Sequence, residues 1–166
     1  MKRHSYISGV GHNLPEKIMK NQDLSNYMDT SDEWISERTG IKERRYIDSE
    51  MGPSDLAIPA VEEALSNANL TVYDIDMIIF ATSTPDYYAP GSGCLLQDKM
   101  GFNNIGALDI RVQCSGFIYG LSIAEQYIKN GTYDNILLVG AEVQSTAMDL
   151  STKGRNVAVI FGDGAG

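Results

Sequence analysis

Short apolar runs alternate with segments of helical pattern along this chain. Stretches in which apolar positions alternate with polar ones, and short continuous apolar runs, indicate strands, whereas recurrence every three or four residues indicates amphipathic helices. Strands are predicted at His4–Val10, Asp76–Ser83, Gly106–Gln113, Asn135–Ala141 and Val157–Phe161. Helices are predicted after Asn21, over Ser31–Thr39, over Asp55–Ala68, around Cys94 and after Cys114. This order predicts an α/β fold, a largely parallel sheet with helices on both faces.

The segment "TSDEWISERTG" has the boundaries of a short helix. Thr30 followed three residues later by Glu33 predicts a capping box, and Gly40 is placed to end the helix. Trp34 and Arg38 are four residues apart and therefore share a face. Two interpretations are open: an arginine laid over a partly exposed tryptophan, or an aromatic surface and a cation that bind a phosphorylated, adenine-containing ligand.

The charge balance limits the possible ligands. The chain has 22 acidic and 13 basic side chains and a net charge of -9, which disfavours binding to nucleic acid or to an anionic membrane surface. An anionic ligand must therefore meet a local basic patch. The stretch "RTGIKERR" offers one at Lys42, Arg44 and Arg45, and the alternative is a solvated surface beside Glu37 and Glu43.

Targeting signals and cysteine usage indicate a cytoplasmic protein. The sequence has no long apolar run and no signal-peptide pattern. Its two cysteines, Cys94 and Cys114, are too few for a disulfide framework, and neither has histidines at metal-ligand spacing. We therefore expect no structural disulfide and no metal site. Cys94, among small residues before two leucines, is predicted to be a packing residue.

The hydrophobic pattern changes its period at Cys114. Before it, apolar Leu108, Ile110 and Val112 alternate with polar residues, as in a strand with one buried face. After it, apolar residues recur at helical spacing, and Gly131 stands where a helix would end. A thiol at such a turn lies near unpaired helix amides, which favour a thiolate and can bind an oxyanion. The pattern indicates a nucleophile for acyl transfer, and a small buried residue is the alternative.

Several long stretches together resemble one family. These are "DTSDEWISERTGIKERR", "IDMIIFATSTP", "QCSGFIYGLSIAEQYIKNG", "LLVGAE" and "GRNVAVIFGDGAG". In this order they resemble the N-terminal half of β-ketoacyl-acyl-carrier-protein synthase III, a condensing enzyme of the thiolase superfamily. The resemblance implies a thiolase-like half with a five-stranded mixed sheet and helices on both faces. Residues 1–166 would form this N-terminal domain, and the C-terminal half would lie outside the chain.

The resemblance also implies the site residues. The acylated nucleophile falls on Cys114. Contacts to the adenine and phosphates of coenzyme A fall on Trp34, Arg38 and Arg155, and Thr39 falls at the entrance to the same site. Coenzyme A enters as a thioester substrate, so no permanently bound cofactor is expected. Gln113 stands where the family more often has a small residue.

The implied reaction belongs to the EC 2.3.1 acyltransferases. An acyl group passes from acyl-coenzyme A to Cys114, and a decarboxylative Claisen condensation with malonyl-acyl carrier protein follows, in fatty-acid or related polyketide biosynthesis. The family stabilises the enolate with a histidine and an asparagine from the C-terminal half, and neither His4 nor His12 matches that motif. The strand "GALDIRVQ" implies a homodimer, because in the family it pairs across a two-fold axis.

Three other functions are kept open. A cysteine hydrolase or thiol-redox enzyme could use the same turn, although no second cysteine or suitable histidine accompanies Cys114 in the sequence. The chain could instead be a non-catalytic fragment or interaction module. A thiolase-superfamily acyltransferase with a different acceptor is the third alternative.

Overall fold

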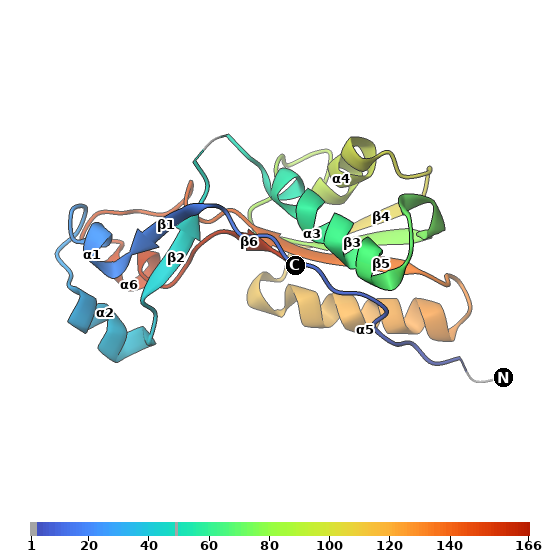
Figure 1. Ribbon diagram of the computed structural model, residues 1–166, viewed down its shortest axis with the longest axis horizontal. Helices are drawn as coiled ribbons and strands as arrows, with labels where there is room; N and C mark the ends of the chain where they lie inside the picture. Colours follow the sequence, from blue (N-terminus) through green and yellow to red (C-terminus); the bar gives the residue numbers. More distant parts are fainter. Residues whose placement is uncertain (1–2, 49) are drawn as a thin grey trace. The chain divides into compact units, whose positions relative to one another are not determined.

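The computed structural model describes residues 3–48 and 50–166, which fall into two compact units (Figure 1). The larger unit takes its described residues from Met1–Asn13, Met51–Glu142 and Ala165–Gly166. The smaller unit takes them from Leu14–Glu50 and Val143–Gly164. Among these residues, no helix is both long and apolar enough to cross a lipid bilayer.

The larger unit is built on a sheet that, in the described residues, has four strands in the order β4-β3-β5-β6. Their bounds are β3 Met77–Ala81, β4 Gly106–Ile110, β5 Ile136–Glu142 and β6 Gly164–Ala165. The central strand β3 is parallel to both β4 and β5, with Ala81 opposite Ile110 on one side and Gly140 on the other. Gly140 and Gly166 exchange two main-chain hydrogen bonds of 2.8 and 2.9 Å, the pattern of an antiparallel pair. The sheet is therefore mixed.

Helices cover both faces of this sheet. Helices α3 (Pro53–Ala68) and α4 (Ser92–Met100) lie on one face, and α5 (Gly116–Lys129) lies on the other (Figure 1). Every residue of β3 is buried, as expected for a strand covered on both faces. Helix α5 approaches the sheet closely at Gly120, where an added Cβ would lie 2.4 Å from Leu138 Cδ1. The described residues of this unit also form the 3₁₀ helices η1 (Val72–Asp74) and η2 (Gln113–Ser115).

The smaller unit packs short elements around its own core. An antiparallel pair, β1 (Lys17–Lys20) and β2 (Glu43–Tyr46), is accompanied by α1 (Asn21–Leu24), α2 (Asp32–Thr39) and α6 (Arg155–Ala158). The buried apolar residues of this core are Met19, Leu24, Met28, Ile35, Tyr46, Ala158 and Val159. Trp34 packs against the cluster while staying half-exposed.

A buried arginine joins three segments of this unit. Arg44 is 6% exposed, and its guanidinium donates hydrogen bonds to the main-chain carbonyls of Met19 and Val159 at 3.1 and 2.9 Å. It also donates to Asn21 Oδ1 at 2.9 Å. Burial lowers the pKa of the Arg44 guanidinium, so the cation depends on these three acceptors for the solvation it has lost.

The buried amide of Asn21 extends this network to helix α2. Its Nδ2 donates to Asp32 Oδ1 at 2.8 Å and to the Ile41 carbonyl at 2.6 Å. Asp32 is the first residue of α2 and Ile41 follows the residue that ends it. Asn21 therefore joins both ends of α2 to Arg44, and so fixes the helix that presents Trp34.

Two of the five predicted strands are wrong. Only the three central predictions are strands in the described chain, so the predicted five-stranded sheet is corrected to a four-stranded sheet plus a separate two-stranded one. Residues 4–10 run beside α3 without forming a strand, because Gly9 brings the backbone against Ala64, where a Cβ would lie 2.2 Å from the carbonyl oxygen. Residues 157–161 begin in α6, with Val157 exposed and the next two residues buried together, which is a helical spacing.

The predicted limits of helix α2 need one correction. Ser31, not Thr30, is the N-cap, and its hydroxyl accepts a hydrogen bond from the Trp34 amide at 3.1 Å. The predicted end is confirmed, since Gly40 has a φ of 71° and its amide donates to the Ser36 carbonyl.

We predict that Asn21→Ala destabilises the smaller unit by about 2–4 kcal/mol, because it leaves the buried Arg44 cation and two α2 groups without their partner. Denaturant unfolding followed by the fluorescence of Trp34, the single tryptophan of the chain, measures this directly. The control is Asn26→Ala, because Asn26 is exposed and bonds Asp23 through its main-chain amide. Equal unfolding midpoints for the two variants would contradict the role given to the network.

Candidate functional site

Cys114 lies in η2, between strand β4 and helix α5. Gln113, just before it, has a φ of 50°, in the left-handed region, and so turns the chain sharply from strand to helix. Gly116 opens α5 and lets it approach β3, since a Cβ there would lie 3.0 Å from the Ala81 Cβ. Cys114 is exposed and carries a free thiol. The predicted strand-to-helix turn is confirmed, and it presents the thiol to solvent at the N-terminus of a 14-residue helix.

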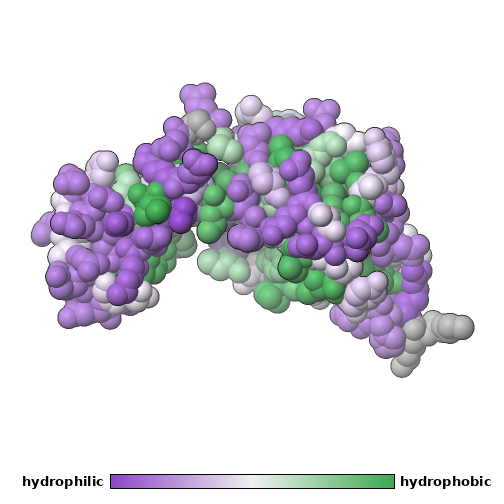
Figure 2. Space-filling view, viewed as in Figure 1, coloured by the Kyte–Doolittle hydropathy of each residue, from purple (hydrophilic) through white to green (hydrophobic). Residues whose placement is uncertain are grey.

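The helix that follows Cys114 exposes large apolar side chains. Phe117, Ile118 and Tyr119 in its first turn are 42%, 64% and 54% exposed. Figure 2 shows hydrophobic residues at the surface on the side of the larger unit where α5 lies. An exposed apolar surface of this kind marks a place where another segment or another chain binds.

A carboxylate that the sequence analysis missed ends the neighbouring strand β5. Glu142 Oε1 accepts a hydrogen bond from the Ser83 amide at 2.6 Å, and its Oε2 accepts from the hydroxyls of Ser83 and Thr84 at 2.9 and 3.0 Å. The signal was present in "LLVGAE", where an acidic residue ends an otherwise apolar strand. Because the carboxyl ends of parallel strands meet at one edge, this group lies at the sheet edge that Cys114 follows.

The second cysteine is not the packing residue that the sequence predicted. Cys94 is exposed on the first turn of α4. Both cysteines therefore lie near a helix N-terminus, but the two N-termini differ. At α4 the carboxylate of Asp109 accepts from the amides of Ser92 and Gly93 at 2.7 and 2.9 Å. That carboxylate therefore occupies the first two amides of α4.

Trp34 lies beneath two arginines in the smaller unit. The guanidinium carbon of Arg38 is 4.2 Å from the ring centroid, and that of Arg155, from α6, is 4.4 Å from it. Arg38 donates to the Trp34 carbonyl at 3.1 Å, and Arg155 donates to the Asp29 carbonyl. Of the two interpretations, the structure contains an arginine laid over tryptophan, and a ligand at this site stays a prediction. The structure brings together Trp34, Arg38 and Arg155, three of the four residues predicted to contact coenzyme A.

Thr39, the fourth of these residues, has a hydroxyl that is engaged at the end of α2. It donates to the Ile35 carbonyl at 2.8 Å and accepts from the Ile41 amide at 3.0 Å. The hydroxyl thus closes the helix locally, beside the turn at Gly40.

The predicted basic patch after Thr39 is corrected by the burial of Arg44. Of its three members, only Lys42 is exposed. Arg44 is the buried centre of the network described above. Arg45 is half-buried and donates to the main-chain carbonyls of Pro15 and Glu16 at 3.3 and 3.4 Å. Two of the three cations are therefore engaged with main-chain carbonyls of the smaller unit.

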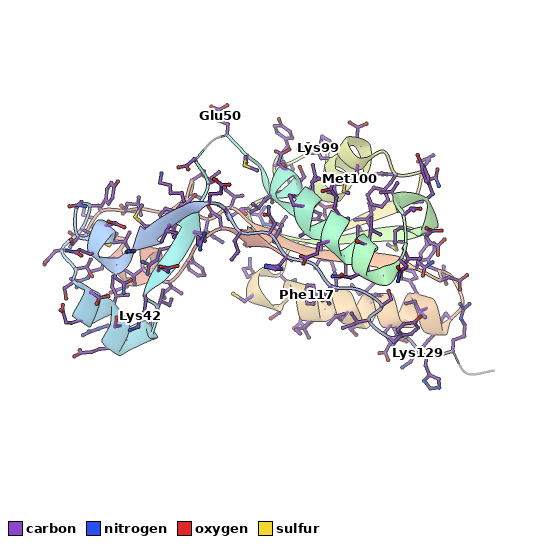
Figure 3. The ribbon with its side chains drawn as sticks, in the orientation of Figure 1. Lys42, Glu50, Lys99, Met100, Phe117 and Lys129 are labelled. Atoms are coloured by element: carbon purple, nitrogen blue, oxygen red, sulfur yellow. The ribbon has the colours of Figure 1, made fainter. Side chains whose placement is uncertain are left out.

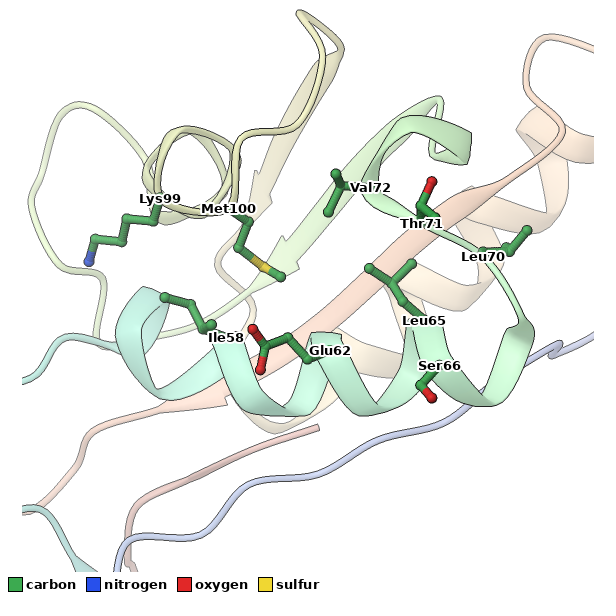
Figure 4. A pocket seen from close by; sticks show the side chains of 9 residues that line it. All are labelled: Ile58, Glu62, Leu65, Ser66, Leu70, Thr71, Val72, Lys99 and Met100. Atoms are coloured by element: carbon green, nitrogen blue, oxygen red, sulfur yellow. The ribbon is translucent and has the colours of Figure 1, made fainter.

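A shallow hollow of about 480 Å³ lies elsewhere on the larger unit (Figure 4). It is lined by Ile58, Glu62, Leu65, Ser66, Leu70, Thr71, Val72, Lys99 and Met100. Lys99 Nζ bonds Asp55 and, at 2.8 Å, Ser54 Oγ. Desolvation raises the pKa of Asp55, but the hydrogen bonds from Lys99 and Gly52 outweigh it and lower that pKa. The hollow is on the α3 and α4 face, so it is not the Cys114 site.

Comparison with known proteins gives consistent matches. A family model described as 3-oxoacyl-[acyl-carrier-protein (ACP)] synthase III matches residues 108–166, which include Cys114. The β-ketoacyl-[acyl-carrier-protein] synthase III of Caldanaerobacter subterraneus subsp. tengcongensis is 53% identical over 160 residues, covering 96% of this chain and 48% of that protein. The enzyme of the same name from Helicobacter pylori strain J99 is 43% identical over 167 residues, covering 100% and 50%.

Solved structures agree with these relatives. The 3-oxoacyl-[acyl-carrier-protein] synthase III of Aquifex aeolicus VF5 superposes with a TM-score of 0.91 at 46% identity, covering 96% of this chain and 51% of that one. The priming β-ketosynthase of the R1128 polyketide pathway gives a TM-score of 0.93 at 30% identity, covering 99% and 48%. The chain thus spans about half the length of the relatives that it matches.

We predict that iodoacetamide alkylates Cys114 about tenfold faster than Cys94 at neutral pH, because cysteines at helix N-termini are in general the more reactive ones, and at α4 the Asp109 carboxylate occupies that N-terminus. Peptide mass spectrometry of briefly treated protein measures both rates.

The matched controls are Cys94→Ser and Cys114→Ser, each of which leaves one thiol. Because both cysteines are exposed, a difference in rate reports thiol chemistry and not access. Equal rates in the two variants would remove the basis for choosing Cys114.

Proposed function

Since the chain corresponds in sequence and fold to the N-terminal half of a β-ketoacyl-[acyl-carrier-protein] synthase III, we propose that it is the acyl-accepting half of a condensing enzyme of fatty-acid biosynthesis. Cys114 takes an acyl group from acyl-coenzyme A. The acyl-enzyme then condenses with malonyl-acyl carrier protein. The names of the relatives support the substrate class, and the turn at Cys114 supports the acceptor.

The observation that carries this proposal is an exposed thiol beyond the carboxyl ends of the parallel strands β3, β4 and β5, directly before α5. Ligands of open α/β sheets bind outside the carboxyl ends of the strands. The Gly116 amide already bonds the Gln113 carbonyl, so the contribution of α5 is the positive end of its dipole, which favours the negative charge on the oxyanion of a tetrahedral intermediate. A buried or mid-strand cysteine would lack this.

The first chemical step is an exchange of one thioester for another. The Cys114 thiol loses its proton, and its sulfur attacks the thioester carbonyl carbon, whose electron pair moves to the oxygen. When that pair returns, the bond between carbon and the coenzyme A sulfur breaks, and the leaving thiolate takes up a proton. The products are acyl-Cys114 and free coenzyme A, and neither water nor an oxidant is consumed.

The arginine-covered tryptophan supports a nucleotide site in this proposal. An adenine ring can stack on Trp34 in place of one guanidinium, and Arg38 and Arg155 can then pair with phosphate oxygens. Thr39 lies at the end of the same helix. In the free protein the guanidiniums keep the ring covered, so binding exchanges a cation–π contact for base stacking and phosphate pairing.

The second step needs groups from beyond these residues. Loss of carbon dioxide from the malonyl thioester leaves an enolate that must be stabilised, and removal of a single donor of this kind typically costs about a hundredfold in rate. The two histidines of the chain, His4 and His12, are exposed, and His12 Nδ1 lies 3.2 Å from Glu63 of α3, on the sheet face opposite α5. We therefore assign the enolate donors, a histidine and an asparagine, to a second half, which would also cover the apolar side chains of α5.

The free edge of β4 supports a homodimer. In the described sheet, β4 is an outermost strand and pairs with β3 alone. Pairing with a second copy across a two-fold axis would satisfy its open hydrogen-bonding groups.

A polyketide starter step is the second candidate function. It is favoured by the TM-score of 0.93 to the R1128 priming β-ketosynthase. Both functions share acyl transfer to Cys114, and they differ in the acyl group and in the carrier protein that follows.

We predict that the protein releases one coenzyme A thiol per chain when mixed with acyl-coenzyme A, and that Trp34→Ala raises the half-saturating concentration about tenfold through lost stacking. The maximal rate stays within about twofold of wild type, since Trp34 does not touch the reacting atoms. Stopped-flow detection of released thiol gives both quantities.

Two controls accompany this measurement. Cys114→Ser abolishes the release, whereas Tyr27→Ala, which removes an exposed aromatic ring of the same unit, changes neither quantity. Release by Cys114→Ser at the wild-type rate would overturn the proposed function. An unchanged half-saturating concentration in Trp34→Ala would remove the nucleotide site from it.

A further inference from the structure

The alternation of side chains along β5 shows which of them face α5. A Cβ added at Gly120 of α5 would lie 2.4 Å from Leu138 Cδ1, and one added at Gly140 would lie 3.3 Å from Phe117 Cδ2. Leu138 and Gly140 are two residues apart, and both therefore face α5. Glu142, the last residue of the strand, is next in this series, so its side chain lies on the α5 face as well.

The residue that bonds Glu142 follows the end of β3, beside the start of α5. Ala81 of β3 approaches Gly116, the first residue of α5, and Ser83 follows two residues later. Its hydroxyl and its amide both bond the Glu142 carboxylate. Ala81 and Gly140 lie level with the start of α5. Ser83 and Glu142 therefore lie just beyond that start, at the end of the helix that Cys114 precedes.

Figure 3 shows the direction of α5, with Phe117 at its beginning and Lys129 at its far end. Strand β5 starts after Lys129 and returns toward the Phe117 end. Glu142 therefore lies toward the end of α5 that follows Cys114.

We infer that Glu142 is a positioning residue for Cys114. Its carboxylate clamps Ser83 and Thr84 at the end of β3, and so fixes the sheet edge against which the thiol and the incoming thioester must align. Three short hydrogen bonds to an ionised acceptor make a strong clamp, two of them to Ser83 and one to Thr84. Glu142 itself does not touch the reacting atoms.

If Glu142 positions Cys114, loss of its carboxylate lowers the rate of acylation and leaves the binding of acyl-coenzyme A unchanged. The inference rests on the proposed acyl transfer to Cys114. A small displacement of a group that aligns reactants can lower a rate by up to about a hundredfold. Glu142→Gln keeps the size of the side chain but replaces one acceptor oxygen by a donor, so it can no longer accept all three hydrogen bonds. The nucleotide site at Trp34 lies in the other unit and is unaffected.

The experiment measures three quantities in the same protein: the rate of acylation by acyl-coenzyme A followed by intact mass, its half-saturating concentration, and the rate of alkylation of Cys114 by iodoacetamide. For Glu142→Gln we expect maximal acylation to fall at least tenfold, with half-saturation and alkylation within about twofold of wild type. A small alkylating reagent needs no alignment against the sheet edge, so a general loss of structure would change alkylation too. Ser83→Ala, which removes one hydrogen bond and no charge, should slow acylation less, and adding it to Glu142→Gln should cost nothing more.

The matched control is Glu125→Gln on α5, where the carboxylate pairs with Lys129 at 2.6 Å toward the far end of the helix. It should acylate at the wild-type rate. Wild-type acylation by Glu142→Gln, or a parallel loss of acylation and alkylation, would overturn this inference and leave the proposed function standing. If Glu142→Gln does not fold, Ser83→Ala decides, and its acylation at the full wild-type rate overturns the inference. Failure of the wild type to be acylated at Cys114 overturns the proposed function and this inference with it.

Discussion

The parallel register of three strands determines where chemistry can occur in the larger unit. Ala81 of β3 lies opposite Ile110 of β4 and Gly140 of β5, so β3 and β4 end level with one another and β5 continues to Glu142. The residues that follow are therefore brought to one edge, with Cys114 after β4 and Glu142 at the end of β5. Ligands of open α/β sheets bind outside the carboxyl ends of the strands, and the loops that follow the parallel strands all begin at that edge. The thiol, the α5 amides and the carboxylate clamp all depend on this alignment.

The smaller unit depends on a buried cation. The Arg44 guanidinium bonds three oxygen acceptors in place of water. One of these acceptors belongs to Asn21, which also hydrogen-bonds both ends of α2. Helix α2 has only eight residues, too few to be stable alone in water, so this network and the Ile35 contact with the core define its position. Since Trp34 lies on α2, the geometry of the arginine-covered ring follows from polar groups that never reach the surface.

The sequence predicted those parts of the fold that have a local physical signal. The turn at Cys114 was predictable because hydrophobic periodicity changes there, and the pair Trp34 and Arg38 because helical spacing puts them on one face. Residues 4–10 carried a strand pattern, but pairing depends on a neighbour that no local pattern specifies. Arg44 was predicted in a basic surface patch, since charge alone does not tell a buried arginine from an exposed one. Glu142 went unnoticed because its importance arises from the register of β5 against β3, a tertiary property.

The proposed function divides the reaction between two parts: this chain would hold the acyl group on Cys114, and a second half would supply the donors for the enolate. It is tested most directly by supplying a purified polypeptide of residues 1–166 with acyl-coenzyme A and malonyl-acyl carrier protein, with and without the C-terminal half. The account predicts acyl-Cys114 in both samples and β-ketoacyl product only when the second half is present. Formation of β-ketoacyl product by residues 1–166 alone, at the rate of the complemented sample, would contradict it.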